Sequence, residues 1–300
     1  MFNLSIPLLL TITIVTSVVV SLTRAAYSKN LPTDNRTLWF FNLVQSVFCG
    51  LMIIAVMGGF GKHSTFTLLL GAVLGAVSAF QLLFNLKAFS AGPFSYTTVI
   101  VSLSAIIPTV SGLFFGETIS PIQWVGIACM AICIILSPDS TKGEHAKKSS
   151  FQWIVFCAAA ALFSGAIGIL QKVHQTSVHK EEKAAFLVSA FLVATVISAI
   201  FLLASPKGAG HESGTKKDKA VRILLPVVTG VCFAFPHTIN LHLSGVLPTA
   251  IMFPMVNIIP MILSTVVAMV MFREKLSLKR WIGVIIGVLS TVLVSGVLPI

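Results

Sequence analysis

Ten apolar runs of about 20 residues each follow one another along this chain of 300 residues. A helix rises about 1.5 Å per residue, so it needs about 20 apolar residues to cross about 30 Å of hydrocarbon. Within lipid the backbone satisfies its hydrogen bonds only in helices or closed barrels, and runs of this length favour helices. The runs cover residues 4–24, 36–57, 65–87, 94–115, 119–137, 151–172, 183–204, 221–241, 247–272 and 280–297. The sequence therefore predicts an all-α integral membrane protein with ten transmembrane helices.

The composition agrees with a lipid bilayer as the main surroundings. Only 10% of the residues are charged, against about 25% in soluble domains. The formal net charge of +11 would suit nucleic acid, but the Lys and Arg residues lie in short segments between apolar runs, as topology-setting loops do. We therefore expect a multi-pass protein of the plasma membrane that binds no nucleic acid. Leu4 to Leu22 has no basic segment before it and no small-residue cleavage site after it, so we expect a retained helix rather than a signal peptide.

Enzymatic and metal-dependent functions find little support in the residues. The five cysteines all lie inside apolar runs, where packing is their expected role, so we predict no disulfide framework, metal site or cofactor. No nucleotide-binding P-loop is present, which argues against ATP as the energy source. A membrane-embedded enzyme would need paired intramembrane carboxylates, a His cluster or a Ser/His dyad, and none is found. An enzyme or a channel is therefore a less favoured interpretation than a carrier.

An internal repeat divides the chain. Residues 117–126 and 274–283 share the pattern E-x-[IL]-S-x-x-x-W-[VI]-G at an offset of 157 (274 − 117), and Asn85-Leu86 matches Asn240-Leu241 at an offset of 155 (240 − 85). Each half holds five helices, an odd number, so the second half enters the membrane in the opposite sense. Such inverted repeats are common in secondary transporters. We predict a first five-helix repeat at 1–137, a polar linker at 138–150 and a second repeat at 151–300, with a further hydrophilic loop at 205–219.

These residues resemble the ten-helix EamA-type members of the drug/metabolite transporter superfamily. The most specific elements are the two Glu…Ser…Trp-x-Gly segments, which look like the family's turn between the fourth and fifth helix of each half. The resemblance implies a carrier with a central cavity lined mainly by helices 1 to 4 and 6 to 9, with helices 5 and 10 outside it. It does not imply a substrate, because the family spans amino acids, sugars, nucleosides, vitamins, phosphorylated metabolites and drugs.

Polar side chains deep in the spans are the candidate substrate-binding residues, because an unpaired polar group in hydrocarbon is costly and faces a cavity or a partner. Several share one helix face, being three or four residues apart, and Asn85 and Asn240 are also related by the repeat. Hydrogen bonds between helices are the competing explanation. Pro108, Pro236, Pro254 and Pro260 are expected to kink their helices where these face protein or a cavity. The candidates are Asn42, Gln45, Gln81, Asn85, His237, Asn240 and Asn257.

Other conspicuous residues have simpler explanations. Glu117 and Glu274 fit helix N-termini through the macrodipole better than proton-coupling carboxylates, and Trp124 and Trp281 fit interfacial anchors better than substrate stacking. Arg24, Lys87 and Lys172 lie near the ends of apolar runs. We expect their side chains to snorkel to the interface.

No Asp or Glu lies deep in any span. The four-helix small multidrug resistance proteins, which are relatives, use such a carboxylate to exchange protons for cations, so its lack argues against cation/proton antiport here. We predict a secondary carrier for a small polar metabolite or amino-acid-like solute, with export as a family-level expectation. A multidrug or cationic compound exporter of the same superfamily is the alternative. If protons are coupled to transport, His237 is the candidate, because an imidazole titrates near neutral pH.

Two arguments on membrane orientation disagree. The loops after the odd-numbered helices, with their flanking residues, hold 16 of the 20 Lys and Arg residues, and the opposite side holds 4. The positive-inside rule therefore places both termini outside. Many ten-helix relatives have their termini inside, so the resemblance favours the other orientation.

Overall fold

The computed structural model describes residues 5–31, 34–116, 118–135, 144–206, 216–271 and 278–294, and within these the chain is helical without a β-strand. The α-helices and short 3-10 helices (η) are, in chain order, α1 (Ile6–Asn30), α2 (Asn35–Met57), α3 (Thr65–Ala91), α4 (Phe94–Ser102), η1 (Leu103–Ala105), α5 (Ile106–Ser111), η2 (Gly112–Phe115), α6 (Pro121–Ile135), α7 (Glu144–Thr176), α8 (Lys183–Ala204), α9 (Lys216–Ser244), α10 (Thr249–Met271) and α11 (Leu278–Val294). Since residues 94–115 form one interrupted segment, the described chain contains ten helical segments.

Several helices continue beyond the predicted apolar runs. Helix α1 ends at Asn30 rather than at residue 24, and α7 begins at Glu144, inside the predicted linker. Residues 144–150 are therefore helical, and α9 likewise begins at Lys216, inside the predicted loop. The helices are longer than the predicted runs because an apolar run marks only the part of a helix that matches hydrocarbon, whereas the backbone hydrogen bonds continue into the polar flanks.

Side-chain caps fix where three helices start. The carboxylate of Asp34 accepts from the amide of Thr37 at the start of α2, and the hydroxyl of Ser64 accepts from the amide of Thr67 at the start of α3. At α6, Ser120 and Gln123 form a reciprocal capping box, with each side chain bonded to the other residue's backbone N–H. The Ser of the first repeated motif is therefore a helix N-cap.

The fourth helical segment is interrupted near Pro108. A proline inside a helix lacks the N–H donor, and its ring clashes with the carbonyl four residues earlier, which here belongs to Ser104. Ser104 lies in the middle of the 3-10 turn η1, which separates α4 from α5. The predicted distortion at Pro108 is thus present, whereas the helices α9 and α10 continue through Pro236, Pro254 and Pro260.

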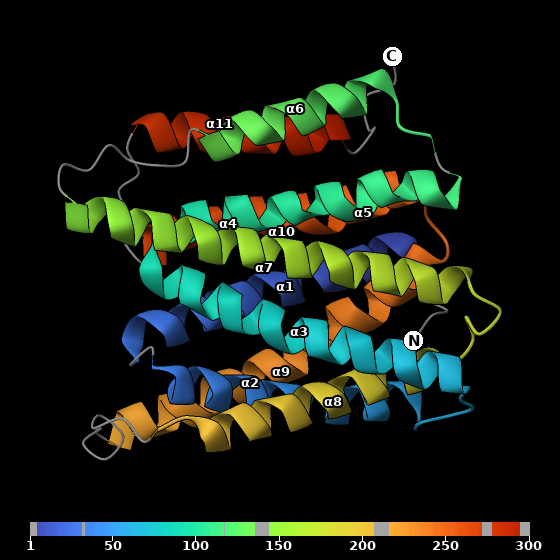
Figure 1. Ribbon diagram of the computed structural model, residues 1–300. Coiled ribbons are helices and arrows are strands. Elements are labelled where there is room, and N and C mark those ends of the chain that lie inside the picture. The colour runs from blue at the N-terminus through green and yellow to red at the C-terminus, as the bar shows by residue number, and fades with distance from the viewer. Residues whose placement is uncertain are drawn as a thin grey trace.

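The helices form one bundle with a repeated pattern of neighbours (Figure 1). Helices α6 and α11 pair at one edge, α2, α8 and α9 lie at the other, and the remaining helices lie between them. Helix α1 packs on α9 as α7 packs on α3, and α2 packs on α9 as α8 packs on α3. The pairs α2–α8, α4–α10 and α6–α11 each join one helix to its counterpart in the other half. Exchanging the halves leaves this pattern unchanged, as expected of a duplicated fold.

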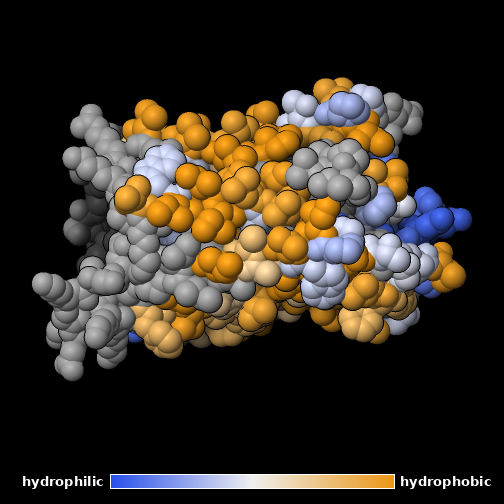
Figure 2. Space-filling view, turned by 90° about the horizontal axis from the view of Figure 1, so that it is seen from above, coloured by the Kyte–Doolittle hydropathy of each residue, from blue (hydrophilic) through white to orange (hydrophobic). Residues whose placement is uncertain are grey.

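The outer surface is apolar. Leu69, Leu162 and Leu192 are 64%, 63% and 63% exposed, which would be costly in water but not in lipid. Figure 2 shows hydrophobic side chains spread over one face of the bundle, with hydrophilic residues gathered at one end. Within the described residues, seven segments are long and apolar enough to cross a membrane. The molecule is therefore an all-α membrane protein, as predicted.

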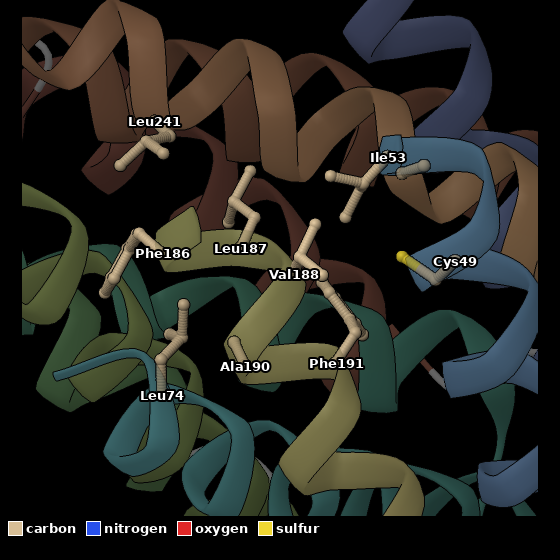
Figure 3. Packing of buried hydrophobic residues seen from close by; sticks show 10 residues of the cluster. Cys49, Ile53, Leu74, Phe186, Leu187, Val188, Ala190, Phe191 and Leu241 are labelled. Carbon is tan, nitrogen blue, oxygen red and sulfur yellow. The ribbon is translucent and has the colours of Figure 1, made fainter. Parts of the chain in front are cut away.

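Helices α3 and α8 approach so closely that two positions on α3 have no room for a side chain. A Cβ on Gly75 would overlap the carbonyl oxygen of Ala190, and a Cβ on Gly71 would overlap the Ser189 side chain. These two glycines form a G-x-x-x-G pair on one helix face, which lets helix backbones approach closely. Figure 3 shows the apolar cluster beside this contact, in which Leu74 from α3 and Ile53 from α2 surround the side chains of α8.

Candidate functional site

A cavity of about 200 Å³ lies inside the bundle. This is smaller than the roughly 300–1,000 Å³ typical of sites for drug-sized ligands, so it suits a small solute. Helices α1, α3, α4, α7, α9 and α10 line it, whereas α2, α6, α8 and α11 contribute no lining residue within the described chain. The resemblance predicted that the fifth and tenth helices, which are α6 and α11, lie outside the cavity wall, and this agrees with the lining residues. It also predicted that the second and seventh helices, which are α2 and α8, contribute to the wall, whereas the structure places both outside it.

The two halves supply equivalent positions to the cavity wall. A constant offset of 147 (171 − 24) relates the lining positions of α1 to those of α7. They are 17, 20, 21 and 24 on α1 and 164, 167, 168 and 171 on α7. Between α3 and α9 the offset is 155, which relates Gln81 to Pro236 and Asn85 to Asn240. The same offset of 155 relates Ser102 of α4 to Asn257 of α10 (257 − 102). The cavity is therefore built around the relation between the repeats.

Five of the seven predicted residues line this cavity, namely Gln81, Asn85, His237, Asn240 and Asn257. The side-chain carbonyl oxygens of Asn85 and Asn240 are buried and have no hydrogen-bond partner within the described residues. An unsatisfied buried acceptor costs about 1–3 kcal/mol, so these two oxygens are suited to accept hydrogen bonds from a bound molecule. Asn257, by contrast, donates to the carbonyl of Phe253 one turn earlier, at 2.7 Å.

Asn42 and Gln45, the two candidates on α2, do not line the cavity, and both are buried between helices. The amide of Asn42 donates to the backbone carbonyl of Ala79 on α3, at 2.7 Å. The side-chain oxygen of Gln45 accepts from Nε of Arg24 at 3.2 Å. These are the interhelical hydrogen bonds that the sequence left open as the alternative.

Arg24 is the cavity residue that sequence reasoning missed. Its side chain is only 6% exposed and lines the cavity, with its guanidinium carbon 4.4 Å from the ring centroid of Phe233. Its Nη2 has no hydrogen-bond partner within the described chain. The predicted snorkelling was wrong because α1 continues to Asn30, which keeps position 24 inside the bundle. The apolar residues that directly follow Arg24 were the available signal of this continuation.

His237 lies beside this cation on α9. Its Nδ1 is 3.5 Å from the side-chain amide nitrogen of Gln171, the repeat counterpart of Arg24. The rings of Phe233 and Phe191 are edge-on to the imidazole, at centroid distances of 4.3 and 5.2 Å. The imidazole and the guanidinium thus share one aromatic neighbour and one cavity.

The two lysines predicted to snorkel differ in their surroundings. Lys172 is only 9% exposed, and its ammonium group donates to the carbonyl of Ser244 at 3.3 Å. Because Ser244 ends α9, this cation lies at the negative end of a helix dipole, and the snorkelling prediction was wrong for it. Lys87 is half-buried, with its ammonium nitrogen 5.7 Å from the ring of Phe156.

The repeated motifs lie away from the cavity. Trp124 and Trp281 are 48% and 41% exposed on α6 and α11, neither of which lines it. This placement leaves the interfacial anchor as their expected role. Glu117 and Glu274 lie outside the described residues, and so does Ser277 of the second motif.

The charge of the cavity wall is one-sided. Among the lining residues of the described chain, Arg24 is the one with a formal charge, and none is Asp or Glu. Within the same part of the chain, no group of three or more His, Cys, Asp or Glu residues could hold a metal ion. The site can therefore offer a guanidinium, several amides and hydroxyls, and one imidazole to a solute.

Comparison with known proteins finds a family match in the second half of the chain. The profile of the EamA-like transporter family matches residues 151–296, which cover the second repeat. None of the curated proteins compared with the chain matches it in sequence.

Known structures extend the likeness to the whole chain. The chain is similar to a protein solved by crystallography, with 13% sequence identity and a TM-score of 0.60 over 95% of this chain and 96% of that one. At this identity the likeness concerns the fold alone.

Proposed function

We propose that this chain, an EamA-type member of the drug/metabolite transporter superfamily, is a secondary carrier that moves a small polar metabolite or amino-acid-like solute by alternating access. Members of this family are membrane transporters, so solute transport is the starting point. The observation that supports a carrier is the cavity wall, to which the two halves contribute equivalent positions. Two similar halves inserted in opposite senses have two conformations of similar energy, each open to one side.

Contacts between the halves at both ends of α8 support the alternating part of the proposal. At its start, the carboxylate of Glu182 accepts from the amide and the hydroxyl of Ser64, at 2.9 and 2.7 Å. At its other end, the guanidinium of Arg36 donates to the carbonyl oxygens of Leu202 and Ser205, at 3.4 and 3.0 Å. A carrier of this kind would break the contacts at one end while it keeps those at the other.

The proposed substrate is small and polar, because the cavity is small and its wall carries amides, hydroxyls and one guanidinium. The buried cation of Arg24 disfavours the alternative, an exporter of cationic drugs, because like charges repel in a medium of low dielectric constant. Export, location in the plasma membrane and proton coupling with His237 as its candidate residue are parts of the proposal that come from the family and the sequence.

The first experiment is a thermal-shift screen of the purified protein against amino acids, nucleosides, sugars, phosphorylated metabolites and cationic drugs. A solute that binds the folded state raises its apparent stability. We expect stabilisation by a small polar solute, lost in Asn85→Ala and followed by uptake of that solute into proteoliposomes. Stabilisation only by lipophilic cations, unchanged in the variant, would favour the drug exporter instead.

A second experiment tests alternating access directly. Ser64→Cys with Glu182→Cys places a disulfide between the halves at one end of α8, and this cross-link should stop transport until a reductant is added. The control pair is Asp34→Cys with Thr37→Cys, whose parent side chains are bonded at the same distance of 2.7 Å within the first half. Transport that persists with the first pair fully cross-linked would contradict alternating access.

A further inference from the structure

We infer that the substrate of this cavity is an anion or a zwitterion, and that its carboxylate or phosphate group binds the guanidinium of Arg24. This inference rests on the proposed function and names the substrate class of the same site. It is carried by a buried cation that faces the cavity and lacks a counter-ion within the described chain.

The cost of burying Arg24 is the first step of the argument. An ionised group removed from water is strongly disfavoured unless it is paired and hydrogen-bonded. The side chain is 94% buried, counting from its 6% exposure, and no carboxylate lines the cavity among the described residues. The contact with Phe233 offsets part of this cost through the cation–π interaction. An anionic solute in the cavity would supply the missing charge.

The orientation of the guanidinium is the second step. Nε is held by Gln45 on α2, which fixes the plane of the group and leaves its two terminal nitrogens for other partners. Nη2 is without one in the described structure. The fork of two N–H groups matches the two oxygens of a carboxylate or phosphate, which a lysine ammonium would bind only as a point charge.

The asymmetry of the wall is the third step. The repeat counterpart of Arg24 is Gln171, which lines the cavity but is neutral. The unsatisfied carbonyl oxygens of Asn85 and Asn240 can accept hydrogen bonds but carry no charge. A solute with an anionic group and hydrogen-bond donors, such as an amino acid or a hydroxy acid, would therefore find one partner for its anion and two acceptors for its donors.

The binding test compares each acid with a partner that lacks its anionic group. L-alanine and L-alaninamide, L-leucine and L-leucinamide, and lactate and lactamide form three carboxylate arms, and sn-glycerol 3-phosphate with glycerol forms the phosphate arm. We expect the acid to stabilise the purified protein and the partner without the anionic group to bind about ten- to hundredfold more weakly, the range for losing one hydrogen bond to a charged group. In Arg24→Gln this difference should disappear. Arg24→Lys should keep part of it, because it keeps the charge without the fork.

Arg222 offers a matched control. It too lies over an aromatic ring, with its guanidinium carbon 5.5 Å from the centroid of Phe40, and it donates to the hydroxyl of Thr37. It does not line the cavity. Arg222→Gln removes one positive charge from a similar setting, and it should leave the preference for acids over amides unchanged.

A second measurement needs no known substrate. Ser21 lines the cavity one turn before Arg24 on α1, so Ser21→Cys places a thiol in the cavity. The labelling rate of this thiol, after subtraction of the labelling of the parent protein, is measured with an anionic and with a cationic methanethiosulfonate reagent. We expect the anionic reagent to react faster, and this preference to be lost when Arg24→Gln is added but kept with Arg222→Gln.

The outcomes separate the inference from the carrier. Acids that bind more tightly than amides in the parent but not in Arg24→Gln support the inference. If no solute of the panel binds, a labelling preference for the anionic reagent that is lost in Arg24→Gln supports it instead. Amides that bind as well as acids, or a reagent preference that does not depend on Arg24, would overturn it. A neutral solute transported normally by Arg24→Gln would leave the carrier standing and remove the inference. Anions that bind at Arg24 but are never transported would support the inference and contradict the proposed carrier function.

Discussion

The Nε of Arg24 on α1 donates to the side-chain oxygen of Gln45 on α2, across 3.2 Å and away from water. The guanidinium carbon also lies 4.4 Å from the ring centroid of Phe233 on α9. Three helices from both halves thus hold one cation at the wall of the cavity. Gln45 does not line the cavity itself, so it acts as a positioning residue for Arg24.

Replacing Gln45 should therefore change the cavity through Arg24. In Gln45→Glu a carboxylate would take the place of the amide, pair with the guanidinium and neutralise it. We expect the preference of a Ser21→Cys thiol for the anionic reagent to fall as far as in Arg24→Gln, with the protein still folded. Gln45→Leu removes the hydrogen bond but not the charge, so it should retain the preference. A Gln45→Glu protein with an unchanged preference would contradict this role.

Two buried asparagines on neighbouring helices should respond to alanine in opposite ways. The carbonyl oxygen of Asn85 is unsatisfied in the cavity wall, so Asn85→Ala should cost little stability and impair transport strongly. Asn42 donates to the carbonyl of Ala79, so Asn42→Ala removes a buried hydrogen bond between α2 and α3 and should cost about 0.5–1.5 kcal/mol. Thermal unfolding and proteoliposome uptake, measured on both variants, check this pair of outcomes.

The repeat adds a third member to this comparison. Asn240→Ala should resemble Asn85→Ala, because both residues line the cavity and both side-chain oxygens lack a partner within the described residues. Trp124→Phe and Glu117→Gln are the reference variants at equal expression, and we expect them to impair transport less. Loss of transport in Trp124→Phe that equals the loss in Asn85→Ala would show that the cavity is not the transport site.

The sequence predicted most of the fold and part of the site, for reasons that particular residues make clear. Apolar length located all ten helical segments, because hydrocarbon thickness fixes that length. It did not locate the true end of α1, so Arg24 was assigned to the interface although it lies in the cavity wall. The spacing of Asn42 and Gln45 placed them on one face of α2, but which neighbour that face meets depends on how distant helices pack.

Tight packing of α3 on α8 makes Gly75 sensitive to a single methyl group. A Cβ there meets the backbone carbonyl of Ala190, which cannot rotate away, so the two helices would have to separate. We expect Gly75→Ala to lower the free energy of unfolding by about 1–3 kcal/mol, as overpacking commonly does. Gly50→Ala on α2 is the control, since its Cβ would lie at an ordinary 3.4 Å from the Cβ of Phe191. Equal thermal midpoints for the two variants would contradict the close contact.

The link between Glu182 and Ser64 should make stability depend on pH in acid. Hydrogen bonds from the Thr67 hydroxyl, and from the hydroxyl and amide of Ser64, lower the pKa of Glu182 from 4.5 to about 2. A carboxyl whose pKa is lower in the folded state adds stability above its unfolded pKa and loses it as the pH falls. The contribution is therefore complete above about pH 4.5 and disappears between about pH 4.5 and 2.

Thermal midpoints of the parent and of Glu182→Gln test this dependence. The parent should exceed the variant at pH 6, and the gap should narrow as the pH is lowered toward 3. Glu181→Gln, which changes an exposed neighbouring carboxylate, should show no such gap. A gap that stays constant down to pH 3 would mean that the ionised carboxylate does not hold Ser64.

Membrane orientation is open to a direct measurement at the C-terminus. Arg24 and Lys172 are buried inside the bundle, so they are weak guides to topology. Without them the charge count changes from 16 against 4 to 15 (16 − 1) against 3 (4 − 1), and the bias persists. Since short basic loops stay in the cytoplasm, we expect both termini outside. A reporter that is active only in the cytoplasm should be silent when fused after Ile300 and active when inserted in the loop between α8 and α9. The reverse pattern would place the termini inside, as in many relatives, and would make this chain an exception to the charge rule.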